Sequence, residues 1–153
     1  VTKGSFYWHF TDRDALLAAL VERWSAITDA LIAEVAFHST PLARLEALIL
    51  AVHRSIEGVR RSRAMGALAA HATLGARMRV VAERRHRFVS DCFQEMGLAP
   101  SAAEASAKLL HAATLGVGEL QLLGLGFDKD AERHAYIEAL LAMVRGLAAK
   151  AAR

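Results

Sequence analysis

The residues with the most distinctive chemistry lie in the first ten positions. Small and basic residues are followed within a few positions by aromatic side chains and a histidine: Thr2, Lys3, Gly4, Ser5, Phe6, Tyr7, Trp8, His9 and Phe10. Phe6 and Phe10 are one helical turn apart, so they can bury only one side of a short helix. The polar tips of Tyr7 and His9 suit phosphate oxygens, and the short side chains around Gly4 allow close approach to base edges. The stretch therefore predicts a DNA-reading element.

Residues 1–24, VTKGSFYWHFTDRDALLAALVERW, resemble the end of the helix-turn-helix of TetR-family transcriptional repressors. The positions that match that family's recognition helix are Gly4, Phe6, Tyr7, His9 and Phe10. Asp12 and Arg13 fall where the family has the cap and the phosphate-contacting cation of the next helix. The predicted DNA-binding residues are Thr2, Lys3, Gly4, Ser5, Tyr7, Trp8, His9 and Arg13. Because the chain begins inside the motif, we expect the first helices of the helix-turn-helix to be missing from it. The alternative is an aromatic-rich turn between two helices.

Composition places the chain among helical globular proteins. It has 153 residues, 54% of them hydrophobic, and a formal net charge of +3, which permits a nucleic-acid partner without requiring one. The single cysteine, Cys92, excludes an internal disulfide, and no secretory signal is recognisable, so we expect a cytoplasmic protein. The apolar stretch 109–127 contains His111, Glu119 and four glycines. It predicts a helix buried on most sides, with no membrane partner.

Helix-start and helix-stop residues divide the rest of the chain into helices. The start signals are Asp12, Thr40 with Pro41, and a capping box over 100–104; the stop signals are Gly75 and Gly97. The expected helices span about 12–37, 41–59, 64–74, 76–96, 101–123 and 130–149. No strand pattern occurs, so we predict an all-α, TetR-like fold. It comprises a partial helix-turn-helix over 1–24 and a ligand-binding and dimerisation domain over 25–153.

The last two predicted helices each carry two apolar faces, and each face needs a partner. Small residues permit close approach, so a twofold interface could pair these helices with their copies in a four-helix bundle. The alternative is that one chain buries both faces. The resemblance implies a homodimer, because a palindromic operator requires two reading heads. The predicted interface residues are Leu109, Ala113, Gly116, Val117, Leu120, Ile137, Leu140, Ala142, Met143, Val144 and Gly146.

Polar residues on apolar helix faces are the candidates for a ligand site. Arg85 interrupts one apolar stripe and His53 another. A buried guanidinium needs an anion, which either Glu119 or a ligand carboxylate could supply. Each residue also has a plainer explanation, a snorkelling arginine and a hydrogen-bonded core histidine. The predicted ligand-binding residues are His53, Arg85, Phe88, Cys92, His111 and Glu119.

These features together predict a ligand-responsive repressor. A small-molecule effector would release it from palindromic double-stranded operator DNA, and it would use no cofactor and no metal. Two alternatives stay open. A helical homodimeric interaction module would bind neither DNA nor ligand. An enzyme could use some of the seven histidines, but HExxH, paired Glu-x-x-His, GxSxG and phosphate-loop motifs are missing from the sequence, which favours a protein that is not an enzyme.

Overall fold

The computed structural model describes residues 10–53, 63–127 and 129–151 of the chain. Within these ranges every regular element is a helix and no strand occurs. The α-helices with described bounds are α2 (Arg13–Ala36), α3 (Pro41–His53), α5 (Gly75–Glu95), α6 (Pro100–Leu122) and α7 (Asp130–Ala151). Residues 63–66 are also α-helical and lead into η1 (Ala67–Ala70), a short 3-10 helix. The all-α prediction is therefore confirmed at the level of fold class.

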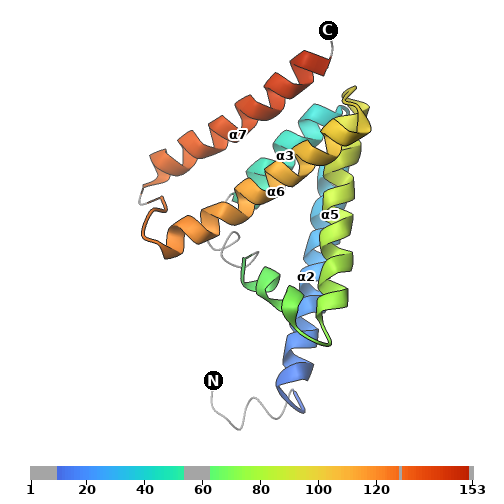
Figure 1. Cartoon of the computed structure of the whole chain (residues 1–153), viewed down its shortest axis with the longest axis vertical. Helices are drawn as coiled ribbons and strands as arrows, with labels where there is room; N and C mark the ends of the chain where they lie inside the picture. Colours follow the sequence, from blue (N-terminus) through green and yellow to red (C-terminus); the bar gives the residue numbers. More distant parts are fainter. Residues whose placement is uncertain (1–9, 54–62, 128, 152–153) are drawn as a thin grey trace.

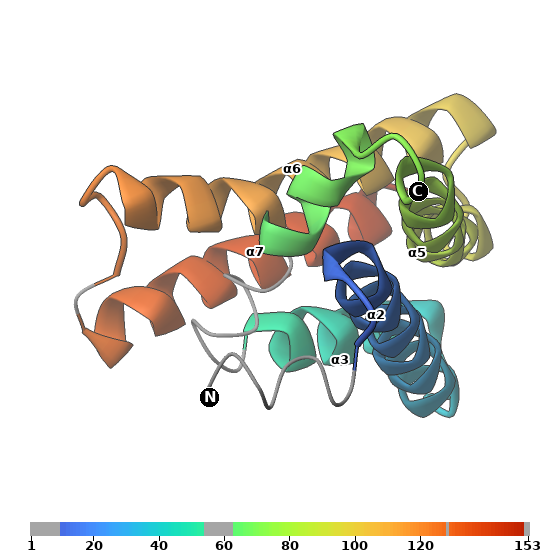
Figure 2. The same cartoon turned by 90° about the horizontal axis from the view of Figure 1, so that it is seen from below.

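The two helices α2 and α5 lie side by side and run in the same direction, α3 and α6 pack against one end of this pair, and α7 packs against α3 (Figure 1). From below, α3, α6 and α7 extend to the same side of the pair (Figure 2). The first turn of α2 and the last turn of α7 lie at opposite ends of the molecule (Figure 1). The predicted domain boundary after Trp24 falls inside α2, so this helix belongs to both predicted parts of the chain.

Apolar side chains at helical spacing hold these helices together in two clusters. The main core joins α3, α5, α6 and α7 through Leu45, Ile49, Val89, Cys92, Phe93, Ala103, Ala107, Leu110, Ile137, Leu140, Leu141 and Val144. A smaller core of Val21, Leu74 and Met78 packs the beginning of α5 against the lower half of α2. The helix α2 is thus held by a small contact area near its beginning and by α3 and α5 further along.

Several predicted helix boundaries are confirmed by hydrogen bonds. The Asp12 carboxylate accepts a hydrogen bond from the backbone N–H of Ala15 at 2.7 Å, and the Thr40 hydroxyl accepts one from Ala43 at 3.2 Å. Each bond satisfies a backbone donor that has no partner within its helix. Gly97, with φ +99°, follows the end of α5 in the left-handed conformation that glycine tolerates best.

The prediction that Gly75 closes a helix is wrong. Gly75 is buried and is the first residue of α5, and η1 precedes it. A Cβ atom at this position would lie 2.5 Å from the carbonyl oxygen of Ala69, a distance that no side chain accommodates. Glycine is therefore needed here because η1 approaches α5 closely.

The predicted capping box at the start of α6 is also wrong. Pro100 is the first residue of the helix, and Ala99, at the cap position, makes no side-chain cap hydrogen bond. The fixed φ of proline suits the first helical position, so the helix begins before Ser101 can cap it. The Glu104 carboxylate is paired instead with His86 and Lys108.

The apolar stretch 109–127 does not form a helix buried on most sides of the single chain. Leu109, Leu120, Leu122 and Leu123 are between 38% and 64% exposed. None of the described helices is long and apolar enough to cross a bilayer. The helix expected over 41–59 is described as far as His53, and residues 54–59 lie outside the described ranges.

Candidate ligand-binding site

A cavity of about 170 Å³ lies where α2, α3, α5 and α6 meet. Most of its wall is apolar, and each of the four helices contributes to it. The described lining residues are Trp24, Ile27, Thr28, Leu31, Ile32, Leu48, Ile49, Ala51, Val52, Arg85, His86, Phe88, Val89, Ala107, Leu110, His111 and Thr114. Buried apolar cavities with a few convergent polar groups are the usual form of a small-molecule site.

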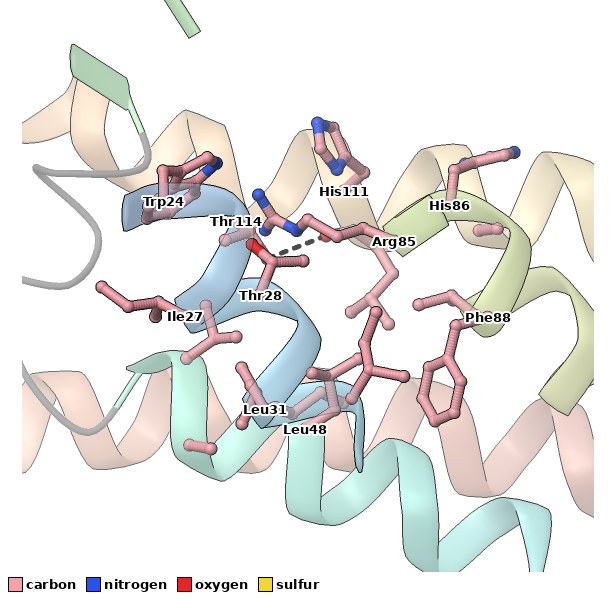
Figure 3. A pocket seen from close by; sticks show the side chains of 17 residues that line it. Trp24, Ile27, Thr28, Leu31, Leu48, Arg85, His86, Phe88, His111 and Thr114 are labelled. Atoms are coloured by element: carbon pink, nitrogen blue, oxygen red, sulfur yellow. Dashed lines mark hydrogen bonds between the residues drawn. The ribbon is translucent and has the colours of Figure 1, made fainter. Parts of the chain in front are cut away.

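The polar groups of the cavity gather at one end. Arg85, Thr28, Thr114 and His111 lie toward one another there (Figure 3). The side chains of Leu31, Leu48 and Phe88 lie at the other end (Figure 3). A ligand that fills this space must therefore carry its polar part at one end only.

Arg85 brings a permanent positive charge into the cavity. Its guanidinium carbon lies 5.4 Å from the centre of the Trp24 ring, within cation–π range. No carboxylate of the described residues forms an ion pair with it. Burial lowers the pKa of Arg85, but a guanidinium stays charged at neutral pH. The structure thus holds a cation at the polar end, supported by an aromatic face.

His111 is the neutral polar neighbour of this cation. Burial lowers the pKa of His111, and the positive charges of Arg85 and His86 lower it further. The imidazole is therefore neutral at pH 7 and can donate one hydrogen bond and accept another.

His86 forms part of the wall between this cavity and a more open groove of about 670 Å³ along α5 and α6. Its Nε2 atom lies 2.8 Å from a carboxylate oxygen of Glu104. Hydrogen bonds from His86 and Lys108 lower the pKa of Glu104, which stays a carboxylate. Glu104 belongs to the groove and not to the cavity, so its charge does not neutralise Arg85 by direct pairing.

No protein-family model matches this chain, and no curated protein matches it.

Three of the six predicted ligand-binding residues line the cavity: Arg85, Phe88 and His111. The other three are corrected by the structure. Glu119 is exposed and paired with Arg63 at 3.0 Å, so it does not serve as the anion for Arg85. Cys92 is 1% exposed within the main core, where burial raises the pKa of its thiol to about 11.

His53, the third corrected residue, is a core histidine. It is 2% exposed, its Nδ1 atom donates to the carbonyl oxygen of Ile49 at 2.9 Å, and its ring lies 5.8 Å from that of Tyr136 on α7. The plainer explanation considered for His53 is the one that the structure supports.

The sequence indicates that the long helix borders the cavity, but it did not single out Thr28, the polar residue of the α2 wall. Trp24, Thr28 and Leu31 are spaced to share one face of this helix, and Thr28 is only 5% exposed. A threonine on an apolar stripe is the signal that could have identified this wall. Thr114, one turn after His111 on α6, gives a similar signal.

The predicted DNA-binding residues Thr2, Lys3, Gly4, Ser5, Tyr7, Trp8 and His9 lie outside the described residues. Arg13, the remaining one, is exposed at the first position of α2.

The predicted dimer interface divides into two groups. Four of its residues are buried within the single chain, so a partner could not reach them: Val117, Ile137, Leu140 and Val144. The structure removes these four from the interface, because they pack against the chain's own helices. The others are at least partly accessible: Leu109, Ala113, Gly116, Leu120, Ala142, Met143 and Gly146.

Proposed function

We propose that this chain is a ligand-responsive, DNA-binding transcriptional regulator of the TetR type, acting as a repressor that a small molecule releases from palindromic DNA. The observation that carries the proposal is the path of α2. Its first turn directly follows the stretch that resembles a recognition helix, and its middle forms one wall of the cavity. One helix therefore connects the two predicted sites.

The mechanism we propose is a shift between two arrangements of α2. A helix of 24 residues is about 36 Å long and behaves as a rigid rod. A ligand in contact with Trp24, Thr28 and Leu31 would favour one position of this rod, and the end near Arg13 would move with it. Two reading helices spaced for successive major grooves would then lose their register.

The outer surface of α6 and α7 supports the homodimer within this proposal. Leu109, Gly116, Leu120 and Leu123 share one stripe of α6, and Ala135, Ala139, Ala142, Gly146 and Ala149 share one stripe of α7. A Cβ atom at Gly116 or Gly146 would meet nothing within 4 Å. Packing within the chain thus does not require glycine there, whereas close approach of a second pair of helices would.

The decisive experiment is selection of duplexes from a random DNA pool by the complete protein, including any residues that precede Val1. We expect a palindromic site to be enriched. Tyr7→Ala, His9→Ala and Arg13→Ala should then weaken binding to every sequence and reduce the salt dependence, because these residues are assigned to phosphates. Thr2→Ala and Lys3→Ala should instead change the sequence preference.

Lys150 provides a matched control, because it is exposed in the last turn of α7, at the opposite end of the molecule from Arg13 (Figure 1). Lys150→Ala should leave DNA affinity unchanged. Unchanged affinity in the Tyr7, His9 and Arg13 variants would contradict the assignment of the first stretch.

The second candidate function is a homodimeric interaction module without DNA or ligand. The exposed leucines of α6 favour it, since they need a partner whether or not DNA is bound. Failure to enrich any duplex, together with a stable dimer, would favour this module over the regulator.

A further inference from the structure

The charge balance of the cavity limits the ligands that it can accept. Its described walls carry the cation Arg85 and no carboxylate. The neighbouring arginine, Arg84, turns to α2 and donates hydrogen bonds to both carboxylate oxygens of Asp29 at 2.6 and 2.7 Å. Asp29 is therefore already paired, and the charge on Arg85 is left for another anion.

We propose that the cavity binds a small, mostly apolar monocarboxylate, whose carboxylate pairs with Arg85 and whose hydrocarbon part lies against Leu31, Leu48 and Phe88. The inference rests on the proposed function and names the chemical class of its effector. A bound carboxylate neutralises the cation in the cavity, while the apolar group fills the space at the other end.

The geometry of the polar end suits a carboxylate. A guanidinium presents its N–H groups in its own plane, where a carboxylate accepts two of them, and its flat face remains free to stack on an aromatic ring. Trp24 occupies the position of such a ring. The neutral imidazole of His111 on α6 and the hydroxyl of Thr28 on α2 are further hydrogen-bonding groups among the lining residues (Figure 3).

The volume sets the size of the ligand. A cavity of about 150 Å³ holds one benzene ring, so about 170 Å³ suits an aryl or short branched alkyl group bearing one carboxylate. A phosphate ester, with more than one negative charge, would need a second cation, and the described walls supply none that is permanent. A cationic ligand would be repelled by Arg85.

Benzoate, with benzamide as its uncharged counterpart and benzylamine as the cation, tests this assignment by calorimetry on the purified chain. Benzoate should bind at least about tenfold more tightly than benzamide, as expected for one charge-assisted pair, and benzylamine should not bind. Benzoate should also change the fluorescence of Trp24, which contacts Arg85; a Trp8→Phe background isolates that signal.

Variants of Arg85 separate a role in binding from a role in folding. Arg85→Met should lower benzoate affinity by about tenfold or more and leave benzamide affinity unchanged. Arg85→Lys keeps the charge but loses the planar guanidinium. Its benzoate affinity should lie between those of the unmodified chain and Arg85→Met. Arg79 lies on the same helix and is exposed, so Arg79→Met is the matched control and should keep the benzoate affinity of the unmodified chain. Circular dichroism establishes that each variant is folded.

Three outcomes would overturn the assignment. The first is no binding of benzoate up to about 10 mM, a concentration that would fill most of a millimolar site. The second is equal binding of benzoate and benzamide, or unchanged benzoate binding in Arg85→Met. The third is a change of Trp24 fluorescence by sodium chloride that equals the change caused by benzoate at the same concentration. Such a result would indicate an inorganic anion site.

The outcome also separates this inference from the proposed function. If the protein selects a palindromic duplex but does not bind benzoate, the proposed ligand class is wrong and the proposed regulator is unaffected. If the protein binds benzoate through Arg85 but selects no duplex, the proposed DNA-binding function is wrong and the proposed carboxylate site is supported.

Discussion

Arg84 and Arg85 occupy adjacent positions of α5 and have different surroundings. Arg84 donates to Asp29 and, at 2.7 Å, to the hydroxyl of Ser25, and so joins α5 to α2. Arg85 points into the cavity and contacts Trp24 (Figure 3). Successive side chains of a helix point about 100° apart around its axis. Arg84 therefore faces α2 and forms an ion pair, whereas Arg85 faces the cavity. The charge of Arg84 therefore has a structural role, and the charge of Arg85 has the proposed role in ligand binding.

Two buried histidines should make stability depend on pH. Burial lowers the pKa of both His53 and His111 below the ordinary value of 6.5. Below pH 6.5 these two histidines therefore bind more protons in the unfolded chain than in the folded one. Their contribution to the free energy of unfolding is fully present above that pH and is lost as the pH falls. We expect the melting temperature to be lower at about pH 5.5 than at about pH 7.5, as measured by circular dichroism.

His53→Leu should make this decrease smaller, because it removes one of the two titrating groups. His38→Leu is the control, since His38 is exposed and lies two residues beyond the end of α2, outside both cores. An equal decrease in the unmodified chain and in His53→Leu would show that His53 does not contribute.

At the scale of elements, the position of η1 depends on a close contact with the beginning of α5. Gly75 lies against the carbonyl oxygen of Ala69, and the neighbouring residues Leu74 and Met78 form the small core with Val21. This contact helps to fix where α5 begins along the length of α2. It also affects the site, because Arg85, Phe88 and Val89 lie on the same helix further along.

Gly75→Ala should destabilise the chain by roughly 1–3 kcal/mol, as expected for overpacking against backbone. Gly66 is the matched control. Its φ of −57° and ψ of −34° are helical, and a Cβ atom there would meet nothing within 4 Å. Gly66→Ala should therefore be neutral or stabilise by up to about 1 kcal/mol. Urea unfolding of both variants tests this difference, and equal stabilities would show that the contact with Ala69 is unimportant.

At the scale of the whole molecule, the helices α6 and α7 carry exposed apolar side chains that could form an interface. Leu109, Leu120, Leu122 and Leu123 are 38% to 64% exposed, and Ala135, Ala139, Ala142 and Gly146 form an exposed stripe of small residues on α7. The last turn of α7 lies at the end of the molecule away from the first turn of α2 (Figure 1). A twofold axis through this interface would leave both α2 helices accessible to DNA.

We expect the chain to be a dimer at micromolar concentration. Gly116→Leu should shift it towards monomer by blocking close helix approach, and Ala142→Glu should do so by placing a charge in the interface. Ala26→Glu, a similar change at an exposed position of α2, should leave the dimer intact. Light scattering measures the mass of each variant. A monomeric unmodified chain would remove the homodimer from the proposal.

The sequence was sufficient to predict the helical class and many of the helix ends. The caps at Asp12 and Thr40 and the stop at Gly97 depend on hydrogen bonds or backbone conformation within a few residues, so local sequence predicts them. It also singled out Arg85, which lines the cavity, because a polar residue on an apolar helix face is visible as a break in the periodicity; the same criterion singled out His53, which does not line it.

Which of these residues meet could not be predicted, because it depends on how the helices pack. Glu119 pairs with Arg63, 56 positions away, and not with Arg85, and Gly75 faces η1 and ends no helix. The wall that α2 gives to the cavity likewise depends on how α2 packs against α3 and α5. The physical reason is the same in each case. Periodicity shows which side of a helix is apolar, but the partner of that side is set by packing among helices that are distant in the chain.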